Sequence, residues 1–378
     1  MRHALKTTLA ALAVTLAAVP AAAQSDILLQ LRSGSPAGDR FRVDSAGAVV
    51  ALGTIGYGII PASGAGWRMM WHPQKVAFRA GYVDAGGQWD ESNIGYYSWA
   101  GGALTTAAGI YSFAMGNLNT VEYGSTGGMA LGGNNTIWGV NGAVYPLALG
   151  YDNDVLDDYG IAIGYKNWSN GTAATAIGYD NTADANYSMA LGYKANTNGQ
   201  VGSIVIATGS PSITTDSLEA GFANEMLIRA SGGIRIRSNV ALSNGCNIAA
   251  SGTNWVCSSS RTLKENFVPV DGEELLRRVR GVPLNRWTLI DDAARTPHMG
   301  PFAEDFHAAF GLGDDPKAIG HQDIDGVNFA GVQALEARTV RMQETIDAQA
   351  RQIEQLQGDK AAMEARIARL EALLTPTP

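Results

Sequence analysis

A short motif recurs through the middle of this 378-residue chain: Ala, then Leu, Ile or Met, then Gly. The alanines of its clear copies are Ala114, Ala130, Ala148, Ala162, Ala176 and Ala190. A weaker copy begins at Ala100. The last three intervals are 14 residues long, and the earlier intervals of 16 and 18 residues leave room for loop insertions. A fixed short period predicts stacked coils, because one unit of this size buries its apolar side only against its neighbours.

The residues of the motif have different roles in such a coil. Alanine and the aliphatic residue point to opposite faces, because side chains alternate along a strand. Alanine suits a crowded interior, and glycine permits a corner with positive φ. A tyrosine ladder is predicted along one face, where tyrosine follows the repeat glycine at Tyr151, Tyr165, Tyr179 and Tyr193. The chain contains 46 glycines and only 16% charged residues, which is typical of repetitive β structure rather than disorder.

The repeat resembles the head of trimeric autotransporter adhesins over residues 97–200. The resemblance rests on the 14-residue period and on the pattern Ser-x-Ala-(Leu/Ile)-Gly, as at Ser188 and Ala190. It implies a left-handed parallel β-roll and three chains associated side by side. We interpret the repeat residues as scaffold, so that a surface for an unknown receptor or glycan lies at the variable positions between them.

Residues 1–23 are typical of a secretory signal peptide. Arg2 and Lys6 give a basic start, residues 7–20 form an apolar run, and residues 21–23 are the small alanines of a cleavage site. The run is too short for a permanent membrane span, and no later segment is as long and apolar as a span requires. We therefore expect a secreted or cell-surface protein with no integral membrane segment in the mature chain. The net charge of −8 argues against nucleic acid as a partner.

The segments that flank the repeats, residues 24–96 and 201–256, are predicted to be β structure without assigned chemistry. Strands are expected before the repeats at 41–44, 67–71 and 76–81. After the repeats, residues 226–230 and 233–237 predict a hairpin that turns at Ser231-Gly232. We interpret the lone His72 as structural.

Two cysteines, Cys246 and Cys257, occur in the chain. In an exported protein they predict a disulfide that staples a hairpin, and the alternative is two free thiols. Neither a metal nor a cofactor site is expected, and zinc is disfavoured because no His lies between the cysteines. An acidic insertion has two open interpretations, a calcium-binding loop or a solvated loop. Its carboxylates are Asp152, Asp154, Asp157 and Asp158.

The sequence changes character near residue 257, where the glycine-rich β sequence ends. Separated motifs then follow at 257–267, 275–279, 284–287, 298–306 and 325–329. In order and spacing they resemble the C-terminal intramolecular chaperone of phage tail spikes such as endosialidase, over about residues 257–345. The resemblance implies a small α+β domain at 257–331 that promotes trimer assembly and cleaves itself off. His298 matches a position often occupied in that family, and the alternative is a hydrogen-bonded core histidine.

In that family a serine and a lysine five residues later form the catalytic pair, which here implies Ser259 and Lys264. A lysine can take the proton of a serine hydroxyl once burial lowers its pKa. Ser259 would attack the carbonyl of Ser258, so that the chain is cut between them. Two alternatives stay open: Ser258 or Ser260 is the nucleophile, or the pair lies on a solvated turn of a domain that only trimerises. No Ser-His-Asp set indicates a general protease.

Heptad spacing over residues 332–374 predicts a coiled coil. Its a positions are Val332, Thr339, Ile346, Ile353, Lys360, Ile367 and Leu374. Its d positions are Leu335, Met342, Gln349, Leu356, Met363 and Leu370. Ile at a with Leu at d favours a coiled coil of two helices. Both resemblances imply three chains, and we expect a trimer. The alternative is one amphipathic helix packed on its own domain.

These features predict a homotrimeric extracellular fibre that is mainly β, followed by a small α+β domain and a coiled coil. Its enzymatic activity would be limited to autoproteolysis in cis. Two other functions stay open: an uncleaved structural surface protein with a trimerisation domain, and a tail-spike-like fibre that degrades polysaccharide.

Overall fold

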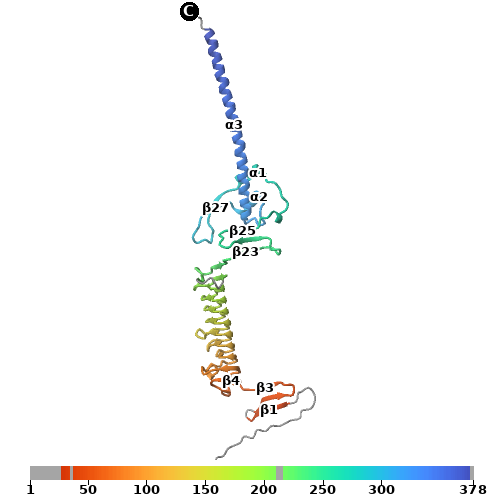
Figure 1. Cartoon of the computed structure of the whole chain (residues 1–378), viewed down its shortest axis with the longest axis vertical. Helices are drawn as coiled ribbons and strands as arrows, with labels where there is room; N and C mark the ends of the chain where they lie inside the picture. The colour runs from red at the N-terminus through yellow and green to blue at the C-terminus, as the bar shows by residue number, and fades with distance from the viewer. Residues whose placement is uncertain (1–26, 35–36, 210–215, 375–378) are drawn as a thin grey trace, which may run out of the picture. The chain divides into compact units, whose positions relative to one another are not determined.

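The computed structural model describes residues 27–34, 37–209 and 216–374, so the expected signal peptide lies outside the described residues. The chain divides into two compact units, Met1–Ser258 and Ser259–Pro378, which are described separately. The first unit is mainly β and contains a parallel β-solenoid (Figure 1). The second is a small α+β region with a long C-terminal helix. The fold class predicted from the repeat is thus confirmed.

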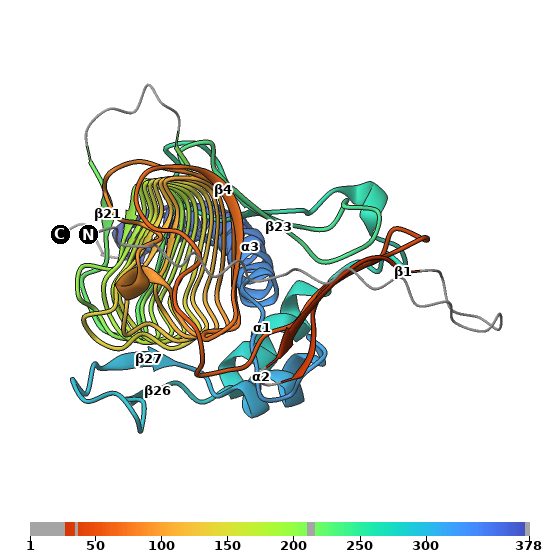
Figure 2. The same cartoon turned by 90° about the horizontal axis from the view of Figure 1, so that it is seen from below.

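Two sheets form the solenoid, and their strands are parallel except for one antiparallel pair at the N-terminal end. Successive coils superpose when viewed down the stack (Figure 2). The large sheet contains β4 (Gly66–His72), β5 (Ala77–Val83), β6 (Trp99–Ala103), β8 (Phe113–Asn117), β10 (Met129–Gly133), β12 (Leu147–Tyr151), β14 (Ile161–Tyr165), β16 (Thr175–Tyr179), β18 (Met189–Tyr193), β20 (Ile204–Ala207) and β22 (Met226–Arg229). The narrow sheet contains β7 (Thr106–Ala107), β9 (Thr120–Val121), β11 (Thr136–Ile137), β13 (Asp154–Val155), β15 (Trp168–Ser169), β17 (Thr182–Ala183), β19 (Ala195–Asn196) and β21 (Leu218–Glu219). The stack therefore continues on both sides of the motif copies at 97–200.

The repeat residues pair in register from coil to coil. Ala162 pairs with Ala176 and Gly164 with Gly178, and the alanine side chains are fully buried. A larger residue has no room at the glycine: Gly178 has a φ of +124°, and a Cβ there would lie 2.1 Å from the carbonyl oxygen of Gly192. Alanine and glycine are therefore steric requirements of the close stacking.

A ladder of buried asparagines runs through the interior, five residues after every motif alanine except Ala190, where Ala195 takes the position. Its members are Asn119, Asn135, Asn153, Asn167 and Asn181. Asn119 donates from Nδ2 to main-chain carbonyls alone. In each later member, Nδ2 donates to the Oδ1 of the preceding asparagine and to main-chain carbonyls at the coil corner. These bonds satisfy polar groups that would be costly to bury unpaired.

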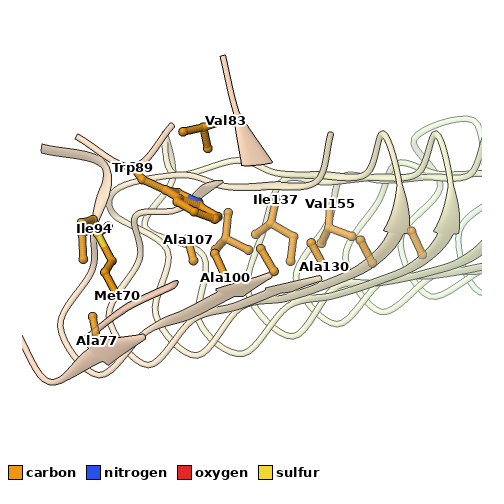
Figure 3. Close-up of a cluster of buried hydrophobic side chains, with 14 residues drawn as sticks. Met70, Ala77, Val83, Trp89, Ile94, Ala100, Ala107, Ala130, Ile137 and Val155 are labelled. Carbon is orange, nitrogen blue, oxygen red and sulfur yellow. The ribbon is translucent and has the colours of Figure 1, made fainter. Parts of the chain in front are cut away.

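The antiparallel pair β4–β5 and the 3₁₀ turn η1 (Glu91–Asn93) close the N-terminal end of the stack. Trp89 is fully buried there among apolar side chains (Figure 3). Its Nε1 donates to the carbonyl of Thr105 at 2.8 Å. Arg79 is also fully buried and donates to Ser98 and Ala107, and burial lowers the pKa of its guanidinium to about 9. His72 is buried with Nε2 2.9 Å from Glu91. Glu91 is a partner of His72 that no sequence pattern indicates.

Two small antiparallel sheets flank the solenoid in sequence. The first contains β1 (Ile27–Gly34), β2 (Ala37–Asp44) and β3 (Val49–Ala51), and the second β23 (Ile234–Arg237), β24 (Gly245–Ile248) and β25 (Val256–Cys257). The expected hairpin around Ser231-Gly232 is wrong. β22 joins the solenoid beside β20, whereas β23 pairs with β24. The aliphatic residues of β22 continue the ladder of the coil before it, which competes with the local turn.

The second unit begins with the 3₁₀ turn η2 (Arg261–Leu263) and contains α1 (Gly272–Gly281), β26 (Asn285–Trp287), β27 (His298–Gly300), α2 (Ala303–Phe310) and α3 (His321–Leu374). Leu275, Phe306 and Val327 form its core, one from each helix. α3 is one continuous helix of 54 residues (Figure 1). The helix begins before residue 332, where the heptads start in the sequence, and its first turns contribute Val327 to this core.

Candidate processing site

The pair implied by the sequence, Ser259 and Lys264, lies at the start of the second unit. Nζ of Lys264 donates a hydrogen bond to Oγ of Ser259 at 2.7 Å. The turn η2 brings the two residues together, because it reverses the chain between them. Its C-cap is Lys264 itself, whose main-chain N–H donates to the carbonyl of Arg261. A spacing of five residues across one tight turn therefore places an amine against a hydroxyl.

The other two serines of the run have different hydrogen bonds. Ser260 is the N-cap of η2: its Oγ accepts from the main-chain N–H of Thr262 and lies 2.9 Å from the hydroxyl of Thr262. Oγ of Ser258 donates to the carbonyls of Ser243 and Gly245, each at 3.0 Å. The side chains of Ser258 and Ser260 are thus bonded within their own local structures.

The surroundings of the pair are open. Ser259 and Lys264 are both solvent-exposed in the single chain. The guanidinium of Arg261 lies 5.1 Å from the ring centre of Phe267, which orders the residues after the turn. Phe267, Val268 and Val270 are exposed apolar side chains just after Lys264. An exposed apolar segment beside the pair is a surface that another chain can cover.

His298 lies apart from the pair, on β27. Its ring stacks on Trp287 of β26, with centroids 4.6 Å apart, which joins the two strands of this hairpin. The stacking on Trp287 gives His298 a structural role in the packing of the hairpin.

Residues 259–312 match the family described as chaperone of endosialidase. Two copies of the YadA head domain repeat match residues 169–195. No match was found among curated proteins or among solved structures. The two families agree with the resemblances read from the sequence, and together they fit a trimeric adhesin or fibre that carries a chaperone domain. The chaperone match begins at Ser259, the first residue of the second compact unit.

The outer surface of the large sheet is a second candidate site. Side chains on both sides of the buried alanine point outward and form apolar ladders from strand to strand. One ladder contains Trp99, Phe113, Met129, Leu147 and Ile161. A parallel ladder contains Met115, Leu131, Leu149, Ile163, Ile177 and Leu191. In contrast, the narrow sheet presents Thr106, Thr120 and Thr136 at the positions before its buried residues.

The tyrosine ladder lies at the edge of this apolar surface. Tyr151, Tyr165, Tyr179 and Tyr193 stack ring on ring, with centroids 5.0–5.8 Å apart. Nζ of Lys166 lies over the ring of Tyr165 at 5.5 Å, and Nζ of Lys194 over that of Tyr193 at 5.9 Å. The ring faces inside the ladder are thus occupied by neighbouring rings.

The aspartates of the acidic insertion are bonded within the coils. Asp152 accepts from Asn134, and Asp158 accepts from the main-chain N–H of Val144. Half-burial raises the pKa of Asp154, although a hydrogen bond from Trp138 opposes that shift. Across residues 27–34, 37–209 and 216–374, no group of three or more His, Cys, Asp or Glu side chains is placed to hold a metal ion. In the same ranges, no helix has the length and apolarity needed to cross a membrane.

Proposed function

We propose that this protein is an exported homotrimeric fibre whose C-terminal unit drives assembly and then cleaves itself off between Ser258 and Ser259. The hydrogen bond between Lys264 and Ser259 carries the proposal, because it joins a base to a nucleophile at the first residue of the chaperone match. Ser258 and Ser260 have other partners, which favours Ser259 as the nucleophile.

The chemistry requires a single base. The neutral amine of Lys264 accepts the proton of Ser259 Oγ, and the oxygen attacks the carbonyl carbon of Ser258. The C–N bond breaks and the lysine returns the proton to the departing nitrogen, which leaves an ester between Ser258 and Ser259 Oγ. Water then hydrolyses the ester to the carboxylate of Ser258 and the free hydroxyl of Ser259.

The apolar surfaces support three chains rather than one. Apolar side chains of the outer ladders are partly or fully exposed in the single chain, as at Met129 and Ile177, and so are seam side chains of α3 such as Leu356. Apolar surface on this scale marks a contact with another protein chain. A trimer that buries both surfaces fits the adhesin and chaperone matches.

Assembly would also activate the pair. A lysine acts as a base when burial removes water from its ammonium form, whereas Lys264 and Ser259 are exposed in the single chain. Neighbouring chains that cover the exposed segment at Phe267–Val270 would supply this burial. Cleavage would then follow assembly, and loss of the chaperone would leave the fibre kinetically trapped.

Intact mass under denaturing conditions tests the proposal, with wild type beside Ser259→Ala, Lys264→Ala and Lys264→Arg. A wild-type cut between Ser258 and Ser259, with all three variants intact, is the expected result. Lys264→Arg is the matched control, because arginine keeps the charge but stays protonated. Ser260→Ala should still be cut, because the hydroxyl of Ser260 caps the turn and is not the proposed nucleophile. A wild type that assembles but stays whole would leave only an uncleaved trimerisation domain.

A further inference from the structure

The last residue before the proposed cut is anchored in a sheet. The main-chain N–H of Ser258 donates to the carbonyl of Gly245 at 2.9 Å. Its hydroxyl donates to the carbonyls of Ser243 and Gly245. The amide and the hydroxyl of this exposed residue thus tie it to Gly245, the first residue of β24, and to Ser243 just before it, although β25 itself ends at Cys257.

A disulfide joins the same two strands one residue earlier. Cys246 and Cys257 are directly opposite in the antiparallel pair β24–β25, and their side chains are bonded. The pair has little else to hold it, because β25 is two residues long and both of its side chains are exposed. The covalent bond therefore maintains the register that gives Ser258 its partners.

Gly245 makes this arrangement possible. Its φ is +148°, and a Cβ there would lie 1.9 Å from the carbonyl oxygen of Ile236 on β23. Glycine therefore lets the centre strand approach β23 closely, while its own carbonyl accepts two bonds from Ser258. A short, covalently closed three-stranded sheet ends at the residue that supplies the acyl group.

We propose that the Cys246–Cys257 disulfide is a positioning element for self-cleavage, which fixes Ser258 before the cut and holds the new carboxyl terminus in the sheet afterwards. This inference rests on the proposed function for its role in the reaction. Geometric control of a reacting carbonyl is worth orders of magnitude in rate, because the attacking atom must meet it along a narrow approach. The reaction would then be faster in the oxidised chain than in the reduced one.

The first test measures hydrogen exchange and does not require cleavage. Uncleavable Ser259→Ala trimers are compared with and without a thiol reductant. We expect reduction to raise the exchange of the Ser258 amide by about tenfold or more while the solenoid amides stay protected. The double variant Cys246→Ser/Cys257→Ser is the control: these are the only two cysteines of the chain, so the reductant should change nothing in it. Unchanged exchange at Ser258 upon reduction would overturn the inference.

The second test measures the rate of cleavage in chains that keep Ser259. The Cys246→Ser/Cys257→Ser variant should form trimers and be cut about tenfold or more slowly. Cys246→Val/Cys257→Val should recover part of the rate, because a β-branched pair restores packing across the strands. Equal rates in wild type and both variants would contradict a positioning role. If no chain is cut in either redox state, the proposed function fails, and the exchange experiment still decides whether the disulfide fixes Ser258.

Discussion

Asn167 donates a hydrogen bond from Nδ2 to Oδ1 of Asn153 at 2.9 Å, and its own Oδ1 accepts from Asn181 one coil further on. Nδ2 of Asn167 also donates to the carbonyls of Ile163 and Gly178. One side chain thus connects three coils at the corner where the main chain turns. Because Asn167 has an asparagine partner on each side in the ladder, it is an informative residue to remove.

We expect Asn167→Ala to lower the free energy of unfolding of the solenoid by about 2–4 kcal/mol, because buried carbonyl and amide groups lose their partners. Chemical denaturation of the trimer, or its melting temperature, measures the effect. Asn141→Ala is the control at an exposed loop asparagine, where a change within about 0.5 kcal/mol is expected. Equal effects at both sites would mean that the ladder contributes nothing beyond surface asparagines.

The close stacking makes a prediction at the repeat glycine. Gly178→Ala would place a Cβ against the carbonyl oxygen of Gly192, at a φ that side chains rarely adopt, so we expect a loss of about 2–5 kcal/mol. Gly199→Ala tests the cost of a positive φ without a clash, because φ there is +70° and a Cβ would have nothing within 4 Å. Urea unfolding of both variants measures the difference, and a milder effect at Gly178 than at Gly199 would contradict the steric argument.

The sequence predicts the stacked coils but only some of the side chains that fill their interior. The motif predicts the buried alanines and the glycine corners, because both follow the strand period. The asparagines recur five residues after five of the six motif alanines, yet nothing local says that a polar residue there points inward. The end of the stack was also missed. β22 pairs with β20, which is distant in sequence, and a local hairpin signal cannot report such a partner.

At the processing site the sequence supplied the residues but not their environment. The family spacing led to Ser259 and Lys264, and the turn at Arg261–Leu263 explains why five residues bring them together. The three consecutive serines cannot be told apart by residue type. They differ in hydrogen bonding, because Ser258 ends a sheet and Ser260 starts a turn. These differences depend on where the folded backbone places each serine, which residue type alone does not reveal.

An ion-pair cluster between α1 and α3 predicts a pH dependence of the chaperone unit. Glu273 accepts from Arg338 and Arg341, and these bonds and charges hold the pKa of Glu273 below its usual value. A lowered pKa in the folded state means that the contribution is complete above about pH 4.3, the ordinary value for the unfolded chain. It is lost as the pH falls through the lowered folded value.

We therefore expect Glu273→Gln to melt below wild type near neutral pH, with the difference shrinking as the medium becomes acidic. Circular dichroism melts at about pH 7 and about pH 3 measure this. Glu336→Gln, at an exposed site on α3, the helix that carries Arg338 and Arg341, is the control with no such trend. A difference between Glu273→Gln and wild type that stays constant over this pH range would rule out the ion pairs as its cause.

The apolar edge of α3 predicts how the proposed trimer is held. Ile353 and Leu356 are more than half exposed in the single chain, and full burial of such side chains is worth about 1.5–3 kcal/mol each. The double change Ile353→Asp/Leu356→Asp should therefore separate the chains, because it places charges in the seam. Arg351→Asp is the matched control, since it alters the net charge by the same amount at a position outside the a and d seam. Sedimentation equilibrium should give trimers for wild type and Arg351→Asp and monomers for the double variant, which should also stay uncut. Uncut trimers of the double variant would mean that the solenoid surfaces suffice for association and that the helix acts in cleavage alone.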